Sequence, residues 1–243
     1  DIVLAHDSFT QQGGAERVFS AMRELFPESF VYTLVKDKDY AFKAMDGKVI
    51  TSPLQGLYNV YPHFQHLFAF IPVVLKFWKP KPAKLLLSSS SSFIKALKKS
   101  AGQIHINYCH TPTRFLWIDP EHAYKEIPSV LHPFARAYFS WMKRWDLKAA
   151  KSVNFFIANS QEVQKRIKQI YNRDSEIIYP FIDTAFWKPT TSQKQDYFLI
   201  AGRLQYAKGL DVVVKVFNDL GWPLHVIGTG RYETELKKMA KEN

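Results

Sequence analysis

Two cations and two glycines lie close together in the segment Gly202–Asp211, between a short apolar run and an amphipathic stretch. The apolar run at 197–201 is typical of a buried strand, and residues 212–217 are typical of the start of a helix. Arg203 and Lys208 are therefore expected in a strand-to-helix turn. Ligands of open α/β sheets bind at the carboxyl ends of strands, and a helix start offers unpaired N–H groups to an anion. The local pattern therefore fits an anion site and an ordinary solvated basic turn equally well.

A histidine at the end of another predicted strand is the second candidate for chemistry. Residues 104–108 form this strand, and Tyr-Cys-His-Thr-Pro carries the chain out of it. His110, fixed by the following Thr-Pro, could hydrogen-bond a ligand or shuttle a proton. Cys109 is the only cysteine and no His-x-x-x-His helix is present, so no metal site is predicted. A nucleophilic role for Cys109 is disfavoured because a thiol in an apolar strand is usually inert.

Glycine-rich turns follow two further predicted strands. Gly13 and Gly14 follow the N-terminal strand, and they permit a tight turn and a close backbone approach to a ligand. The turn lacks the Lys-Ser/Thr pair of a Walker loop. Gly228 and Gly230 follow the strand at 224–227 and could line the same side as Arg203. Both turns also fit a purely structural role.

Predicted strands and helices alternate along the whole chain, which favours an α/β fold of doubly wound parallel sheets. A run of five serines at 88–92 follows the predicted strand 84–87. We expect these serines to cap the start of a helix over 93–99, because serine is a preferred N-cap residue.

The chain of 243 residues carries a net charge of +11 and has a pI of about 9.5. Such an excess attracts nucleic acid, anionic lipid or phosphorylated ligands without choosing among them. Two aromatic and basic segments, 57–82 and 130–151, fit helices packed on a sheet, but also a surface that lies on an anionic membrane. No targeting segment is visible at the N-terminus. The longest apolar stretch, 67–77, has about half the length needed to span a membrane.

Four segments, taken in order, resemble motifs of retaining family 4 glycosyltransferases with the GT-B fold. The segment Tyr-Cys-His-Thr-Pro-x-Arg-x-Leu-Trp is most similar to that of bacterial O-antigen and exopolysaccharide mannosyltransferases. The four segments are Gly13–Arg17, Tyr108–Trp117, Ala158–Ile167 and Gly202–Asp211.

The resemblance implies two Rossmann-like domains. Residues 1–182 would form the N-terminal, acceptor-side domain, and 183–243 the start of a C-terminal domain that binds the nucleotide-sugar. The acidic loop of the family, a Glu followed seven residues later by another Glu, would lie beyond residue 243. We therefore expect a C-terminally truncated piece of a larger enzyme, with little activity of its own.

The same resemblance implies metal-independent transfer, without a cofactor, of a sugar from a donor such as GDP-mannose. The acceptor would be lipid-linked or a saccharide, in surface polysaccharide synthesis in the cytoplasm or at the inner face of the plasma membrane. Arg203 and Lys208 would hold the diphosphate, and His110 would contact the transferred sugar. The other implied substrate contacts are Asp7, Gly13, Gly14, Thr111, Gly228 and Gly230.

Two other classes of function remain open at this point. A nucleotide-sugar sensor could use the same fold without catalysis. A nucleic-acid-binding module would explain the charge and the aromatic residues. However, no RNP-like, zinc-finger or helix-turn-helix signature is present, and the basic residues are scattered, so nucleic acid is not an expected partner.

Overall fold

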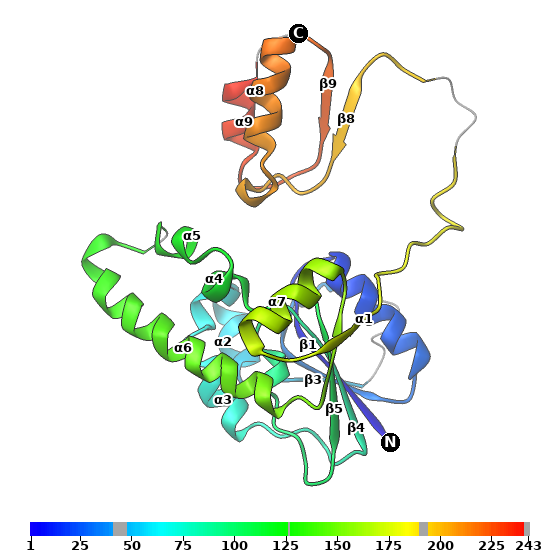
Figure 1. Ribbon diagram of the computed structural model, residues 1–243, viewed down its shortest axis with the longest axis vertical. Helices are drawn as coiled ribbons and strands as arrows, with labels where there is room; N and C mark the ends of the chain where they lie inside the picture. Colours follow the sequence, from blue (N-terminus) through cyan, green and yellow to red (C-terminus); the bar gives the residue numbers. More distant parts are fainter. Residues whose placement is uncertain (41–47, 126, 190–193, 241–243) are drawn as a thin grey trace. The chain divides into compact units, whose positions relative to one another are not determined.

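The computed structural model describes residues 1–40, 48–125, 127–189 and 194–240. The chain forms two compact units, Asp1–Ile182 and Asp183–Asn243 (Figure 1). Each unit has its own parallel sheet and its own apolar core. The predicted α/β fold class is therefore confirmed.

The first unit is built on a parallel sheet that has seven strands within the described residues. Its order is β3-β2-β1-β4-β5-β6-β7, so the order reverses between β1 and β4. Chain segments diverge at such a switch point and leave a crevice where ligands of α/β proteins bind. The strands are β1 (Ile2–Phe9), β2 (Phe30–Lys36), β3 (Val49–Thr51), β4 (Leu85–Ser90), β5 (Ile104–Cys109), β6 (Phe155–Ala158) and β7 (Ser175–Ile177).

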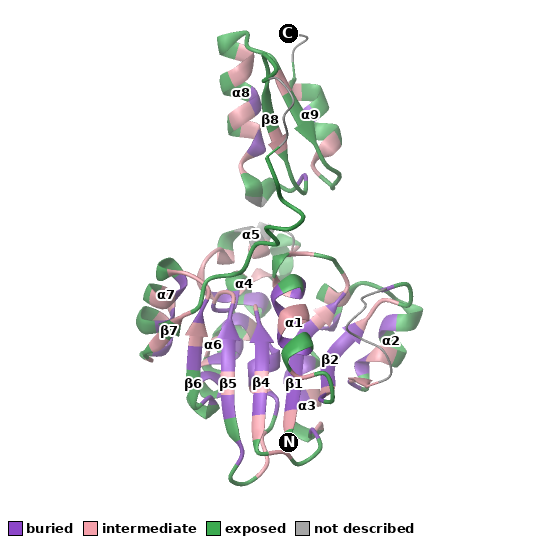
Figure 2. Ribbon diagram, turned by 90° about the vertical axis from the view of Figure 1, so that its right-hand side faces the viewer, coloured by how far each residue is buried: buried purple, intermediate pink, exposed green. Residues whose placement is uncertain are grey.

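Helices cover both faces of this sheet, which explains why β1 and β2 are buried along almost their whole length (Figure 2). The helix α1 (Gly14–Leu25) packs on one face, and α2 (Leu54–Val60), α3 (Ile71–Phe77) and α6 (His132–Ser152) contribute to the core on the other. The helix α7 (Gln161–Tyr171) packs with α6 and β6. Shorter elements are η2 (Phe64–Leu67), η3 (Ile94–Ala96), α4 (Arg114–Trp117), α5 (Pro120–Lys125) and η4 (Ser129–Leu131).

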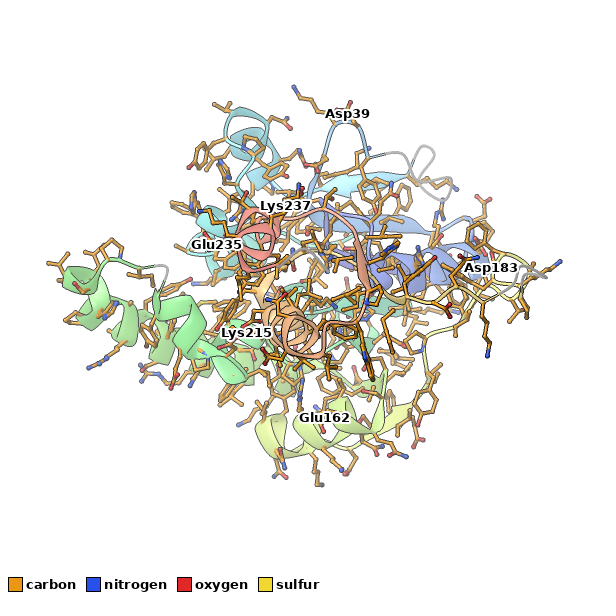
Figure 3. All side chains as sticks on the ribbon, turned by 90° about the horizontal axis from the view of Figure 1, so that it is seen from above. Asp39, Glu162, Asp183, Lys215, Glu235 and Lys237 are labelled. Carbon is orange, nitrogen blue, oxygen red and sulfur yellow. The ribbon has the colours of Figure 1, made fainter. Side chains whose placement is uncertain are left out.

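The second unit pairs two parallel strands with two helices in its described part. A small core joins Leu204, Leu210, Val214 and Leu236. Charged side chains such as Lys215 and Glu235 are exposed on its helices (Figure 3). The elements are β8 (Phe198–Ala201), η5 (Tyr206–Lys208), α8 (Leu210–Leu220), β9 (Leu224–Ile227) and α9 (Glu233–Met239).

The expectation for the serine run is wrong. Ser88, Ser89 and Ser90 belong to β4, and a single 3-10 turn, η3, replaces the helix expected over 93–99. The N–H groups of residues 91–94 are bound by the carboxylate of Asp7 at 2.6–2.9 Å, and no serine caps this turn. A charged acceptor from a neighbouring strand satisfies these donors better than a serine hydroxyl.

No helix of the described ranges is both long enough and apolar enough to cross a lipid bilayer.

Candidate functional site

The predicted turn at Gly13 and Gly14 lies between β1 and α1, beside the switch point of the sheet. The N–H of Gly13 donates to Oε2 of Glu16 at 2.9 Å, which closes the first turn of α1. A Cβ on Gly13 would lie 2.9 Å from the same oxygen, whereas a Cβ on Gly14 would meet nothing within 4 Å. Gly13 therefore makes room for the Glu16 carboxylate, and the surroundings of Gly14 are open.

His110 follows β5 at the carboxyl edge of the sheet. Its backbone N–H donates to Ser90 O at 2.8 Å, and its carbonyl accepts from Asn159 Nδ2 at 3.1 Å. Its Nε2 lies 2.8 Å from Ser89 Oγ. Burial, with repulsion from His6, lowers its pKa to about 4, although Asp7 and Glu16 act in the opposite direction. His110 is therefore a neutral imidazole at neutral pH, with one donor and one acceptor nitrogen.

The two neighbours of His110 differ in what they offer a ligand. The hydroxyl oxygen of Thr111 is buried and has no hydrogen-bond partner among the described residues. Buried hydroxyls are usually satisfied, so this one suits a bound ligand. The Cys109 thiol is also buried, and burial raises its pKa to about 12, which keeps it protonated.

Asp7, predicted to contact the acceptor, is buried and points to the loop after β4. Each of its carboxylate oxygens accepts two backbone N–H groups of residues 91–94. The observed role of Asp7 is to shape this loop at the switch point. Its contact with an acceptor stays a prediction.

A buried ion pair, which sequence reasoning missed, anchors the segment after His110. Nζ of Lys95 lies 2.6 Å from Oδ1 of Asp146, and the two side chains are 1% and 0% exposed. The Asp146 carboxylate also accepts hydrogen bonds of 2.8 Å from Thr113 Oγ1, Trp117 Nε1 and Tyr171 OH. The ion pair thus joins the end of the His-Thr-Pro segment to α6 and α7.

Sequence reasoning also missed His6, Glu16 and Ser89, which link the Gly13 turn to His110. Nε2 of His6 lies 3.7 Å from Oε1 of Glu16, and its Nδ1 lies 3.1 Å from Ser89 Oγ. The same Ser89 oxygen contacts His110. Only the order of β1, β4 and β5 in the sheet brings these residues together.

In the second unit, Arg203 and Lys208 lie on the turn that connects β8 to α8, as predicted from the sequence, and both are exposed. Gly209, with φ of 64°, ends η5 and directly precedes the 11-residue helix α8. A left-handed residue at this point favours glycine. The turn thus combines two cations with the N-terminal end of a helix, which is a chemistry suited to phosphate.

In the second unit, the turn at Gly228 and Gly230 supports the turn at Arg203 through the backbone. Leu204 N–H donates to Thr229 O at 2.9 Å. A Cβ on Gly230 would lie 2.1 Å from Leu204 O, and one on Gly228 would lie 1.8 Å from Gly202 O. These glycines are required for the close packing of the two turns. Their predicted contact with substrate is not needed to explain them and stays a prediction.

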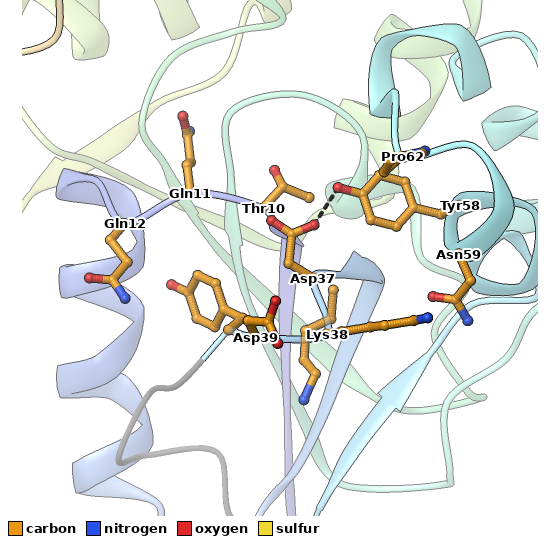
Figure 4. A pocket seen from close by; sticks show the side chains of 11 residues that line it. Thr10, Gln11, Gln12, Asp37, Lys38, Asp39, Tyr58, Asn59 and Pro62 are labelled. Carbon is orange, nitrogen blue, oxygen red and sulfur yellow. Dashed lines mark hydrogen bonds between the residues drawn. The ribbon is translucent and has the colours of Figure 1, made fainter. Parts of the chain in front are cut away.

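A pocket of about 440 Å³ opens where β1 and β2 end, next to the Gly13 turn (Figure 4). Tyr58 OH donates to Asp37 Oδ1 at 2.5 Å, and Lys36, Lys38 and Asn59 also line the pocket. The pocket thus combines hydrogen-bonding side chains with the rings of Tyr58 and Pro62.

Within the described part of the chain, no group of three His, Cys, Asp or Glu side chains is placed to hold a metal ion. Metal independence stays a prediction.

Comparison with known families decides the class of protein. The profile of Glycosyltransferase Family 4 matches residues 12–186, well over half of the chain. The chain belongs to glycosyltransferase family 4. The matched range of this family 4 chain contains the Gly13 turn, Ser89 and His110. A comparison with curated proteins gave no match.

Solved structures of HepE from Anabaena resemble the family 4 chain in fold. The complexes with UDP, with UDP and glucose, and with UDP-glucose are 16%, 17% and 18% identical to it, each with a TM-score of 0.62. The likeness covers 98% of this chain but 65% of HepE, so the chain spans less than two thirds of that protein. At such identity the likeness concerns the fold, which is of the predicted GT-B type.

Proposed function

We propose that the protein is a glycosyltransferase that moves a sugar from a nucleoside-diphosphate sugar to an acceptor, with retention and without a metal. Membership of family 4 supports the class of reaction. The observation that carries the proposal is the exposed pair Arg203 and Lys208 on the turn before α8, with the turn held by the backbone of residues 228–230.

The chemistry required is the departure of a nucleoside diphosphate. As the bond between the sugar and the diphosphate breaks, negative charge grows on the leaving phosphate. Arg203, Lys208 and the N–H groups at the start of α8 would stabilise this charge in place of a metal ion. Neutral His110, with the free hydroxyl of Thr111 beside it, would position the sugar.

We infer that the donor is GDP-mannose, because the Cys-His-Thr-Pro segment resembles that of mannosyltransferases. The structures of HepE contain UDP and UDP-glucose, and this supports a nucleotide-sugar donor. UDP-glucose is therefore the main alternative to GDP-mannose. A panel of nucleotide-sugars with the full-length protein tests the assignment. Turnover of GDP-mannose is expected; turnover of UDP-glucose alone would contradict the choice of mannose. Donor binding without transfer to any acceptor would instead favour a non-catalytic sensor.

A lipid-linked or saccharide acceptor, a role in surface polysaccharide synthesis and a cytoplasmic location complete the proposal. A groove of about 840 Å³ between α3 and α6 supports peripheral binding to an anionic membrane. Four lysines (Lys76, Lys98, Lys99 and Lys148) line it together with Trp141, Trp145 and Phe77. Phe77 is 71% exposed. Cations beside exposed aromatic rings match an anionic headgroup layer.

Vesicle sedimentation tests this part. We expect the protein to sediment at low salt with vesicles of phosphatidylglycerol and phosphatidylcholine, but not with phosphatidylcholine alone. The Lys76→Glu/Lys148→Glu variant should lose this binding, and a matched change at Lys237 and Lys238 on α9 should not. Equal binding by the groove variant and the wild type would contradict the assigned surface.

A further inference from the structure

A continuous path of buried polar groups runs from the Gly13 turn to His110. It passes from Glu16 to His6 (3.7 Å), from His6 to Ser89 (3.1 Å) and from Ser89 to His110 (2.8 Å). His6 and Ser89 are opposite each other in the register of β1 and β4, and His110 directly follows β5. Three neighbouring strands of the sheet therefore place three side chains in one row.

The path is enclosed by protein. His6, Ser89 and Glu16 are 2%, 0% and 4% exposed. The ring of His6 stacks on Phe9 at 4.9 Å and lies 5.1 Å from Phe19 on α1. Because such burial excludes bulk water, the hydrogens along the path must be shared among these protein groups.

The direction of the hydrogen bonds follows from the Glu16 end. Burial raises the pKa of Glu16, but the contact with His6 and the N–H groups of Glu16 and Gly13 outweigh it, so the pKa is below its usual value. The ionised carboxylate lies 3.7 Å from Nε2 of His6, which is beyond hydrogen-bond distance, and its negative charge favours hydrogen on this nitrogen.

If His6 is neutral, only one arrangement of hydrogens on His6, Ser89 and His110 is consistent with hydrogen on Nε2 of His6. Its Nδ1 is bare and accepts the hydrogen of the Ser89 hydroxyl. A hydroxyl has a single hydrogen, so Ser89 Oγ must accept its second bond from Nε2–H of His110. In a neutral imidazole this leaves a lone pair on Nδ1 of His110.

We propose that Glu16, acting through a neutral His6 and Ser89, is a positioning residue that fixes the tautomer of His110 and presents its Nδ1 to a ligand as a hydrogen-bond acceptor. The path itself is independent of the ligand. If the proposed function holds, Nδ1 accepts from a hydroxyl of the donor sugar. The site would then favour a neutral sugar over one that offers a carboxylate at that point, since a carboxylate cannot donate.

The Glu16→Gln variant tests the direction of the path with a nearly isosteric change. The amide oxygen keeps the bond from Gly13 N–H, so the NH₂ group faces His6. The hydrogens must then reverse: His6 Nδ1–H donates to Ser89, and Ser89 O–H donates to Nε2 of His110. His110 is left with its hydrogen on Nδ1.

The measurement is ¹⁵N–¹H correlation NMR of the imidazole rings in the ligand-free 243-residue chain, with His110 assigned by its loss in His110→Asn. We expect hydrogen mainly on Nε2 in the wild type and mainly on Nδ1 in Glu16→Gln. His105, bonded to Ser88 on the other side of β4, is the control and should keep its tautomer.

Ser89→Ala cuts the path, so His110 should become a mixture of tautomers, and adding Glu16→Gln should change nothing further. Hydrogen on Nδ1 in the wild type would overturn the proposal. So would an unchanged His110 in either folded variant. No donor is present in this experiment, so its outcome is separate from that of the nucleotide-sugar panel.

Discussion

Replacing Lys95 with methionine should be among the most destabilising single changes in the first unit. The substitution leaves Asp146 buried, 0% exposed, without the cation 2.6 Å away. Removal of one partner of a buried pair costs about 3–5 kcal/mol, because the remaining charge is uncompensated. Three hydrogen bonds of 2.8 Å still reach the carboxylate, so we expect the lower end, about 3 kcal/mol.

Urea unfolding followed by tryptophan fluorescence measures this loss. With a slope of about 2 kcal/mol per molar urea, the midpoint of the first unit should fall by about 1.5 M. Lys168→Met is the matched control, because Lys168 makes a pair of 2.8 Å with Asp174 on the surface. Exposed pairs are worth about 0–1 kcal/mol. The reasoning is refuted if Lys95→Met costs no more than the control.

Three further predictions use the same urea measurement. Asp7→Asn should lower the free energy of unfolding by about 3 kcal/mol. The amide NH₂ would face two of the N–H groups at 91–94, so two charge-assisted hydrogen bonds would be lost. A loss below about 1 kcal/mol would count against the structural role of Asp7. Gly230→Ala should destabilise the second unit by about 1–3 kcal/mol, because its Cβ would overlap Leu204 O. Gly14→Ala should have no effect on stability, because its Cβ would meet nothing within 4 Å. Equal effects of the two changes would contradict the close packing of the Arg203 and Gly230 turns. Finally, burial lowers the pKa of His105 to about 3 and that of His110 to about 4, below their usual 6.5. Between the folded and the unfolded pKa values, the unfolded chain binds more protons than the folded chain. The free energy of unfolding should therefore fall as the pH drops from about 6.5 to 4, by up to about 1.4 kcal/mol per pH unit for each histidine. His105→Leu should reduce this slope, and an unchanged slope would argue against a buried neutral His105.

The alternation of strands and helices was sufficient to predict the fold class and the position of the turns. Local patterns sufficed there because an apolar run, a glycine and an amphipathic stretch specify a strand, a turn and a helix without reference to distant residues. The Arg203 and Lys208 turn and the location of His110 after β5 followed in this way.

The residues that sequence reasoning missed depend on contacts between distant segments. The serine run was wrongly expected to cap a helix because Asp7, more than eighty residues away, takes those N–H groups. Within β4, Ser89 faces His6 and His110, while Ser88 and Ser90 bond Asn107 on the other face. This alternation gives each serine its partners only because β4 lies between β1 and β5, and the sequence alone does not specify this strand order. Glu16 left one local signal, its position three residues after Gly13 at a helix start.

The most direct test of the proposed function is the rate at which the full-length protein releases GDP from GDP-mannose in the presence of acceptor. The account predicts that Arg203→Ala lowers this rate by about 10²–10³-fold, as expected when a group that stabilises transition-state charge is removed. Lys237 is an exposed cation on α9 that pairs with Glu233. The rate of the Lys237→Ala variant should stay within about twofold of the wild-type rate. A wild-type rate in Arg203→Ala would contradict the assignment of this turn to the leaving diphosphate.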